Sequence, residues 1–127
     1  MKILICDDHK IVRIGIRHLL QQLKGVISID EAENGNEALA FLKSNDINIV
    51  LLDITLPGIS GLEVLQIIKT KWKTINVLML SMHPQEQYAI RALKLGASGY
   101  LTKDTASEEL LLAVKKIAAG GKYISMA

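Results

Sequence analysis

Short apolar segments alternate along the chain with longer segments of helical periodicity. The apolar segments cover residues 3–6, 26–32, 47–53, 75–80 and 99–101. Residues 49–52 form an unbroken apolar run, which is typical of a strand covered on both faces. After each of these segments, apolar residues recur at the three- and four-residue spacing of a helix. The pattern therefore predicts five strands alternating with five helices, with parallel pairing and right-handed crossovers.

Polar and glycine residues predict where the helices begin and end. In three places a capping-box pattern predicts a helix N-terminus, because a glutamate follows three residues after Asn34, Ser60 or Thr105. Gly25 is expected to close the first helix, which would then span residues 10–24. These signals place the helices between the predicted strands.

The fourth predicted helix, residues 85–95, has the weakest apolar stripe. Its inward positions are mainly Ala89 and Ala92, and Gly96 is expected to close it. A helix that buries little apolar surface is weakly held. We therefore expect this helix to move most readily.

Five parallel strands with helices on both faces form a three-layer α/β sandwich of the flavodoxin-like type. The common strand order of such a doubly wound sheet is 2-1-3-4-5, in which strands one and three are neighbours. Asp7 and Asp8 follow strand one, and strand three ends at Asp53. Because ligands bind at the carboxyl ends of the strands, we expect these three carboxylates to converge.

Three carboxylates in one crevice repel one another and favour a bound cation. Oxygen ligands are typical of a hard ion, so Mg²⁺ or Mn²⁺ is the expected metal. Such a site is suited to a phosphoryl group, and Asp53, at its centre, is the expected nucleophile. Ser81 and Lys103 follow the fourth and fifth strands and offer a hydroxyl and an ammonium to carboxylate or phosphate oxygens.

Composition narrows the class of protein. The 127 residues are 50% hydrophobic and 22% charged, which indicates one globular domain. A net charge of +2 and an aromatic content of 4% do not favour nucleic-acid binding by this chain itself. We expect no signal peptide and no membrane segment. Cys6, the single cysteine, lies in an apolar strand and predicts a buried thiol in a reducing compartment, so a cytoplasmic location is expected.

The residues at four strand ends resemble the receiver domain of two-component response regulators, and the similarity covers essentially the whole chain. The matching positions are Asp7, Asp8, Asp53 with Pro57 and Gly58 behind it, Ser81 and Lys103. This resemblance implies a CheY-like fold. It also implies that Asp53 accepts a phosphoryl group from a phosphohistidine of a sensor histidine kinase, or from a small donor such as acetyl phosphate. The chain would then be a phosphoacceptor that assists its own phosphotransfer and hydrolysis, rather than an enzyme.

The same resemblance implies a ligand set for Mg²⁺. Asp8 and Asp53 would bind the ion directly, and the backbone carbonyl of Thr55 would be the third protein ligand. Asp7 would act mostly through water.

The resemblance also implies how phosphorylation is sensed. Lys103 would contact a phosphoryl oxygen, and Ser81 would turn to hydrogen-bond another. Tyr100 would then turn inward as an aromatic switch. The surface expected to change comprises the fourth strand, the fourth helix and the fifth strand.

The C-terminal end of the chain resembles one subfamily in particular. Residues 101–104 and 119–125 are similar to the NarL/FixJ (LuxR-type) subfamily, whose receivers precede a helix-turn-helix DNA-binding domain. We therefore expect a receiver domain at residues 1–119 and the start of a linker at residues 120–127. DNA would be bound only by an output domain outside this chain, and phosphorylation would favour a homodimer. A receiver that stands alone is the alternative.

Three other functions were weighed against this interpretation. A flavodoxin-like cofactor protein would share the fold, but Asp7 and Asp8 would repel the phosphate of FMN. A haloacid-dehalogenase-like phosphatase needs a second acid two residues after its nucleophile, where this chain has Thr55. A phosphate-independent interaction module stays open, although an intact acidic set argues against it.

Overall fold

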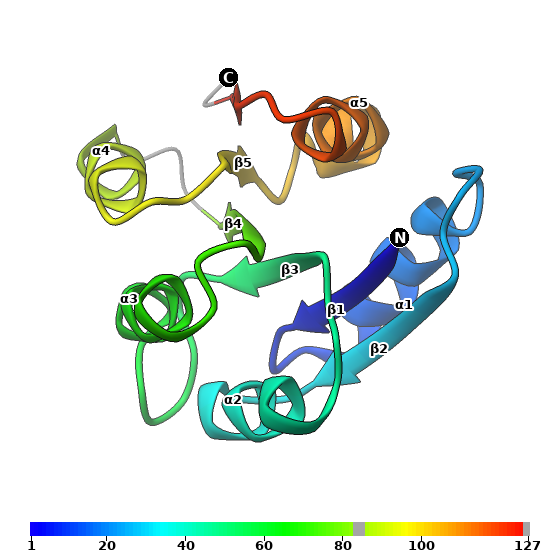
Figure 1. Cartoon of the computed structure of the whole chain (residues 1–127). Coiled ribbons are helices and arrows are strands. Elements are labelled where there is room, and N and C mark those ends of the chain that lie inside the picture. The colour runs from blue at the N-terminus through cyan, green and yellow to red at the C-terminus, as the bar shows by residue number, and fades with distance from the viewer. Residues whose placement is uncertain (83–85, 126–127) are drawn as a thin grey trace.

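A single parallel sheet runs through the centre of the protein (Figure 1). The computed structural model describes residues 1–82 and 86–125. Its strands are β1 (Lys2–Cys6), β2 (Ser28–Ala32), β3 (Ile49–Asp53), β4 (Asn76–Ser81), β5 (Gly99–Thr102) and β6 (Tyr123–Ile124). Their spatial order is β2-β1-β3-β4-β5-β6. The predicted order 2-1-3-4-5 is confirmed, and a short sixth strand extends the sheet beyond β5.

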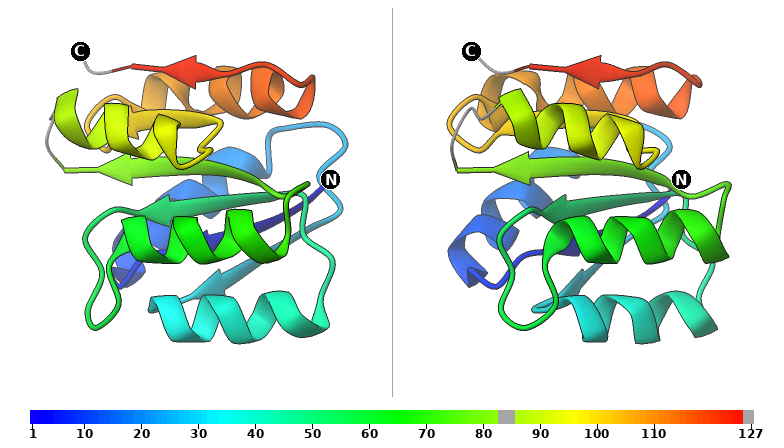
Figure 2. Two further views of the ribbon diagram at one scale, coloured as in Figure 1. Left: turned by 60° about the vertical axis from the view of Figure 1, so that its left-hand side comes forward. Right: turned by 90° about the vertical axis from the view of Figure 1, so that its left-hand side faces the viewer.

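Helices cover both faces of the sheet. They are α1 (Lys10–Leu20), α2 (Gly35–Ser44), α3 (Gly61–Lys71), α4 (Glu86–Lys94) and α5 (Ala106–Ala118). Two of them, α1 and α5, lie on one face, while α2, α3 and α4 lie on the other (Figures 1 and 2). The three-layer α/β sandwich is therefore confirmed. Within the described residues, every helix is too short or too polar to traverse a bilayer.

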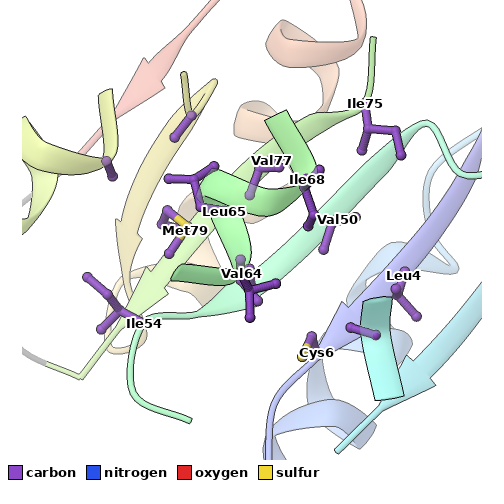
Figure 3. Close-up of a cluster of buried hydrophobic side chains, with 14 of the residues drawn as sticks. Leu4, Cys6, Val50, Ile54, Val64, Leu65, Ile68, Ile75, Val77 and Met79 are labelled. Atoms are coloured by element: carbon purple, nitrogen blue, oxygen red, sulfur yellow. The ribbon is translucent and has the colours of Figure 1, made fainter. Parts of the chain in front are cut away.

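Alternation along the strands divides the core into two clusters. On one face, alternate strand residues pack against α2, α3 and α4 (Figure 3); they include Leu4, Cys6, Val50, Leu52, Val77, Met79 and Tyr100. The intervening residues pack against α1 and α5 on the other face; they include Ile3, Ile5, Ile49, Leu51, Leu78, Leu80 and Leu101. Strands covered on both faces read as continuous apolar runs, which is why no polar alternation appears in residues 49–52.

The first helix is shorter than predicted. It ends at Leu20, not at residue 24, because the N–H groups of Gln22 and Leu23 donate to carbonyls three residues back. This tighter turn still carries Leu23 into the core, where its side chain is 9% exposed. Gly25 then adopts a φ of 88° and turns the chain toward β2. Helical spacing alone does not distinguish this turn from a further helical turn.

At two of the three predicted helix starts, the N-cap side chain makes the expected hydrogen bond. The side chains of Asn34 and Ser60 accept hydrogen bonds from the N–H groups of Glu37 and Glu63, at 2.8 Å and 3.3 Å. The third predicted helix start is confirmed, because Thr105 is the N-cap residue of α5, but its side chain makes no capping hydrogen bond. Its hydroxyl instead donates to the carbonyl of Thr102 at 3.1 Å.

Residues that the sequence assigned to a linker continue the sheet. Tyr123 and Ile124 pair in parallel with Gly99 and Tyr100, and the N–H of Ser125 donates to the carbonyl of Tyr100 at 2.9 Å. The predicted fourth helix is confirmed from Glu86 onward, while its expected first residue lies outside the described residues.

Candidate functional site

Asp53 ends β3, and both of its carboxylate oxygens have partners. The backbone N–H of Thr55 donates to Oδ1 at 3.1 Å, and the Lys103 ammonium donates to Oδ2 at 3.1 Å. Only 1% of the Asp53 surface is exposed. The site is therefore a nearly buried carboxylate with a fixed orientation.

The loop after Asp53 is shaped by two glycines. Gly58 adopts a φ of 74°, which glycine reaches without strain. Gly61 starts α3 so close to the loop that a Cβ there would overlap the carbonyl oxygen of Asp53. The N–H of Gly61 donates to the carbonyl of Ile54 at 3.1 Å. These contacts anchor α3 directly on the backbone that carries the central carboxylate.

The loop between β1 and α1 supplies the other two acids. Asp7 is fully buried, and its Oδ1 accepts the N–H of His9 at 2.8 Å. Asp8 is more open, with 35% of its side chain exposed. His9 Nδ1 lies 3.1 Å from Asp7 Oδ1 and 3.2 Å from Asp8 Oδ1. The predicted convergence of Asp7, Asp8 and Asp53 is thus present.

Lys103 joins the two buried carboxylates. Its Nζ lies 2.7 Å from Asp7 Oδ2 and 3.1 Å from Asp53 Oδ2. Burial by itself lowers the pKa of Lys103, but the close contact of its ammonium with Asp7 and the charges of Asp53 and Asp7 outweigh it, so the pKa is raised. The ammonium is therefore held in its charged form.

The pKa of Asp53 is shifted upward. Burial is the largest cause, and the charge of Asp7 adds to it, whereas Lys103 and the Thr55 N–H oppose it. The same surroundings act on Cys6, where burial, followed by the charges of Asp53 and Asp7, raises the thiol pKa to about 12. Cys6 is a free, buried cysteine, as predicted, and its thiol stays protonated at neutral pH.

The residues present fit a hard divalent cation. Ligand atoms of Asp7, Asp8, His9 and Asp53 all lie within 4.8 Å of one another. Asp7 Oδ2 is buried and accepts no well-aligned hydrogen bond from the described residues, although Lys103 Nζ is close to it. Carboxylate oxygens grouped in this way suit Mg²⁺. The sequence analysis did not predict that His9 takes part, although its position directly after two acids was an available signal.

Ser81 and Tyr100 both lie near this edge of the sheet. Ser81 ends β4 and pairs with Thr102, one position beyond the pair formed by Asp53 and Leu80. It is 3% exposed, and its carbonyl accepts the N–H of Lys103 at 2.7 Å. Tyr100 is completely buried, in the cluster shared with α4.

One residue close to the site was missed by the sequence analysis. Arg13 on α1 is only 6% exposed, and its Nη1 donates to the backbone carbonyl of Asp7 at 2.6 Å. Its Nε donates to Glu31 of β2 at 2.8 Å. A charged residue in a helical pattern predicts a solvent-facing position, and nothing in the local sequence indicates the distant acid that pairs with it.

Comparison with known proteins decides the family. The profile of the response regulator receiver domain matches residues 3–115. The chain belongs to this family. The receiver fold explains why acids, a hydroxyl residue and a lysine occupy successive strand ends, and the CheY-like fold prediction is confirmed.

Relatives place this receiver in the NarL/FixJ (LuxR-type) subfamily, as predicted. It is 36% identical over 125 residues to the nitrate/nitrite response regulator protein NarL of Escherichia coli (strain K12), and 34% identical over 125 residues to the response regulator UvrY of the same strain. Each alignment covers 98% of this chain but only 58% of NarL and 57% of UvrY. A solved structure of two RcsB dimers bound to two parallel DNAs is 26% identical, with a TM-score of 0.91, and the match covers 98% of this chain and 63% of that one. The receiver thus spans somewhat more than half the length of these curated relatives.

Proposed function

We propose that this receiver accepts a phosphoryl group on Asp53 from a phosphohistidine of a sensor histidine kinase. The observation that carries the proposal is the Lys103 ammonium, which lies within 3.1 Å of both Asp53 Oδ2 and Asp7 Oδ2. A purely structural sheet edge gains little from three acids and a lysine gathered in one nearly buried place. The arrangement is suited to a carboxylate nucleophile, because the Lys103 ammonium can offset the negative charge of the phosphoryl group that Asp53 receives.

The chain's own residues account for the geometry of the transfer. An Asp53 oxygen forms the new bond to phosphorus as the phosphorus–nitrogen bond of the donor breaks. The electron pair stays on the imidazole nitrogen, which takes a proton from water. The Thr55 N–H orients the carboxylate through Oδ1, and Lys103 is placed to contact an oxygen of the transferred group.

We further propose that the transfer requires Mg²⁺ or Mn²⁺. Asp8, Asp53 and the carbonyl of Thr55 would hold the ion, with Asp7 acting through water. When bound, the ion neutralises charge on the transferring oxygens. Without an added cation, the raised pKa of Asp53 shows that Lys103 alone does not offset burial and the charge of Asp7.

Phosphorylation would be sensed through Ser81 and Tyr100. The hydroxyl of Ser81 would turn toward the new phosphoryl group, and Tyr100 would couple this turn to the face formed by β4, α4 and β5. Tyr100 is already buried in this structure, so the structure would represent the inward orientation of the proposed switch.

The output of the switch is proposed from the relatives. An RcsB structure contains dimers bound to DNA, which supports homodimer formation and a DNA-binding output domain after a linker that starts within residues 120–127. The DNA would be bound by that domain, and the protein would act in the cytoplasm. A stand-alone receiver, or an interaction module that needs no phosphate, would give a different result below.

The first experiment is incubation with Mg²⁺ and acetyl phosphate, followed by intact-mass measurement. The wild-type protein is expected to gain one phosphoryl group, and Asp53→Asn is expected to gain none. The matched control Asp46→Asn changes an acid on the opposite edge of the sheet and should leave the gain intact. Absence of an adduct on the wild type with acetyl phosphate and with phosphorylated kinase domains would overturn the proposal and favour a phosphate-independent module.

A further inference from the structure

Arg13 is a buried cation that the phosphotransfer chemistry does not use directly. It is on α1, and only 8% of its side chain is exposed. Arginine is seldom buried this deeply unless it is paired. Here its guanidinium donates to two acceptors on different elements, the backbone carbonyl of Asp7 at 2.6 Å and the carboxylate of Glu31 at 2.8 Å, and its Nη2 lies 3.7 Å from the exposed carboxylate of Glu33.

The carbonyl of Asp7 lies just past the end of the β1 ladder. The register of β1 with β2 and with β3 ends at Cys6, and the N–H of Asp7 makes one further bond to the carbonyl of Ala32 at 3.1 Å. Beyond this point the loop that carries Asp7 and Asp8 has no strand to hold it. A charge-assisted hydrogen bond from Arg13 fixes the peptide unit that joins the two acids.

Glu31 fixes the guanidinium in turn. Its Oε1 accepts from Arg13 Nε and its Oε2 accepts from Arg17 Nε, each at 2.8 Å. Arg17 also donates to the carbonyl of Ile29 at 2.8 Å. The two arginines therefore share one carboxylate, but within the described part of the chain only Arg13 of this pair contacts the acidic loop.

We propose that Arg13 is a positioning residue, which holds the peptide between Asp7 and Asp8 so that both carboxylates face Asp53. The proposal rests on the proposed function of the acidic site as a cation-dependent phosphoacceptor. A residue that orients ligands from behind typically contributes ten- to a hundredfold in metal affinity. If the arginine only linked α1 to β2, its replacement would lower the stability of the protein and leave the ion affinity of the folded protein unchanged.

The shared carboxylate provides a matched pair of variants. Arg13→Met removes the contact with Asp7 and one half of the pairing with Glu31, whereas Arg17→Met removes the other half and leaves Asp7 untouched. The binding of Mg²⁺ and of Mn²⁺ alone is measured by calorimetry, with urea unfolding in parallel and amide spectra that report on the N–H of His9. We expect Arg13→Met to weaken ion binding by about ten- to a hundredfold and to shift the His9 signal. Arg17→Met should change the affinity by less than about twofold, because Arg17 does not contact the loop that carries the acids and a side chain tunes a metal site only through contact with its ligand residues.

Equal ion affinities in the two folded variants would overturn the proposal, whatever the loss of stability. If Arg13→Met does not fold, Arg13→Lys decides, because it keeps the charge but cannot span both acceptors: weakened ion binding supports the proposal, and wild-type affinity overturns it. Failure of the proposed function would look different. In that case the wild-type protein itself would bind no divalent ion or form no Asp53 adduct.

Discussion

Two helices on the same face of the sheet, α3 and α4, are held in different ways. Helix α3 buries Val64, Leu65 and Ile68 completely and begins at Gly61, against the backbone of Asp53 (Figure 3). A groove lined by residues of both helices, among them Leu62, Glu63, Arg91 and Lys94, separates them. The buried residues of α4 are only Ala89 and Ala92. One helix is therefore fixed to the site and to the core, while the other is attached through small side chains.

The apolar surface that α3 buries stabilises it far more than the two alanines stabilise α4. Burying a valine, leucine or isoleucine contributes about 1.5–3 kcal/mol, whereas a single methyl group contributes about 0.8 kcal/mol. Elements that rearrange during signalling come from the less stable part of a fold. Helix α3 thus supplies a rigid frame for Asp53, and α4 can move without disrupting that frame.

The largest expected effect is on stability. Ile68→Ala in α3 should lower the free energy of unfolding by about 2–5 kcal/mol, because it leaves a cavity at a fully buried position. Ile90→Ala in α4 removes the same atoms from a side chain that is 44% exposed and should cost about 1 kcal/mol or less. Urea unfolding of both variants tests the comparison, and equal losses would show that α4 is held as firmly as α3.

The next effect is a change of conformation upon binding of beryllofluoride, which imitates the phosphoryl group. With Mg²⁺ present, amide signals of Ser81 and of residues 86–103 should shift more than those of α3, since the weakly held elements respond to the occupied site. Asp53→Asn should show no such shifts. Changes confined to residues 53–60 would contradict a moving α4.

The smallest effect concerns the outer strand of the sheet. Hydrogen bonds from Ser125 and then Tyr123, each 2.7 Å long, lower the pKa of Glu109 from 4.5. Because the folded pKa is the lower one, this stabilisation is present in full above the ordinary pKa and is lost as the pH falls through the folded value. Signals of Tyr123 should therefore change as the pH falls below the ordinary glutamate pKa of 4.5, while those of α3 stay constant.

A variant sharpens this pH prediction. Tyr123→Phe removes one of the donors, so the pKa of Glu109 should rise toward 4.5 and the release of the strand should begin at a higher pH. Titration of the Glu109 carboxyl by NMR measures this directly. An unchanged midpoint would mean that the hydroxyl of Tyr123 does not contribute.

Predictions from the sequence succeeded where one local pattern determines the structure. The run before Asp53 is apolar on both faces, and the rule for doubly wound sheets places the ends of β1 and β3 together. These two features were enough to predict the cluster of Asp7, Asp8 and Asp53. The caps formed by Asn34 and Ser60 could be predicted for the same reason, because each side chain bonds to a backbone N–H only three residues further along the chain.

Features that depend on distant partners were not predicted. The sequence around Arg13 is typical of a surface residue. Arg13 can be buried because the pairing of β1 with β2 brings Glu31 of β2 next to it. The two residues of β6 are too few to show a period, and their attachment depends on Glu109 in the preceding helix.

The direction of β6 determines in which direction the chain leaves the sheet. This strand runs parallel to β5, so the chain at Ser125 heads toward the edge of the sheet that carries Asp53 (Figure 2). A domain joined there would begin on the side from which a phosphohistidine must approach. Kinase and output domain would then compete for the same space, and the length of the tether would set how easily the receiver can be phosphorylated.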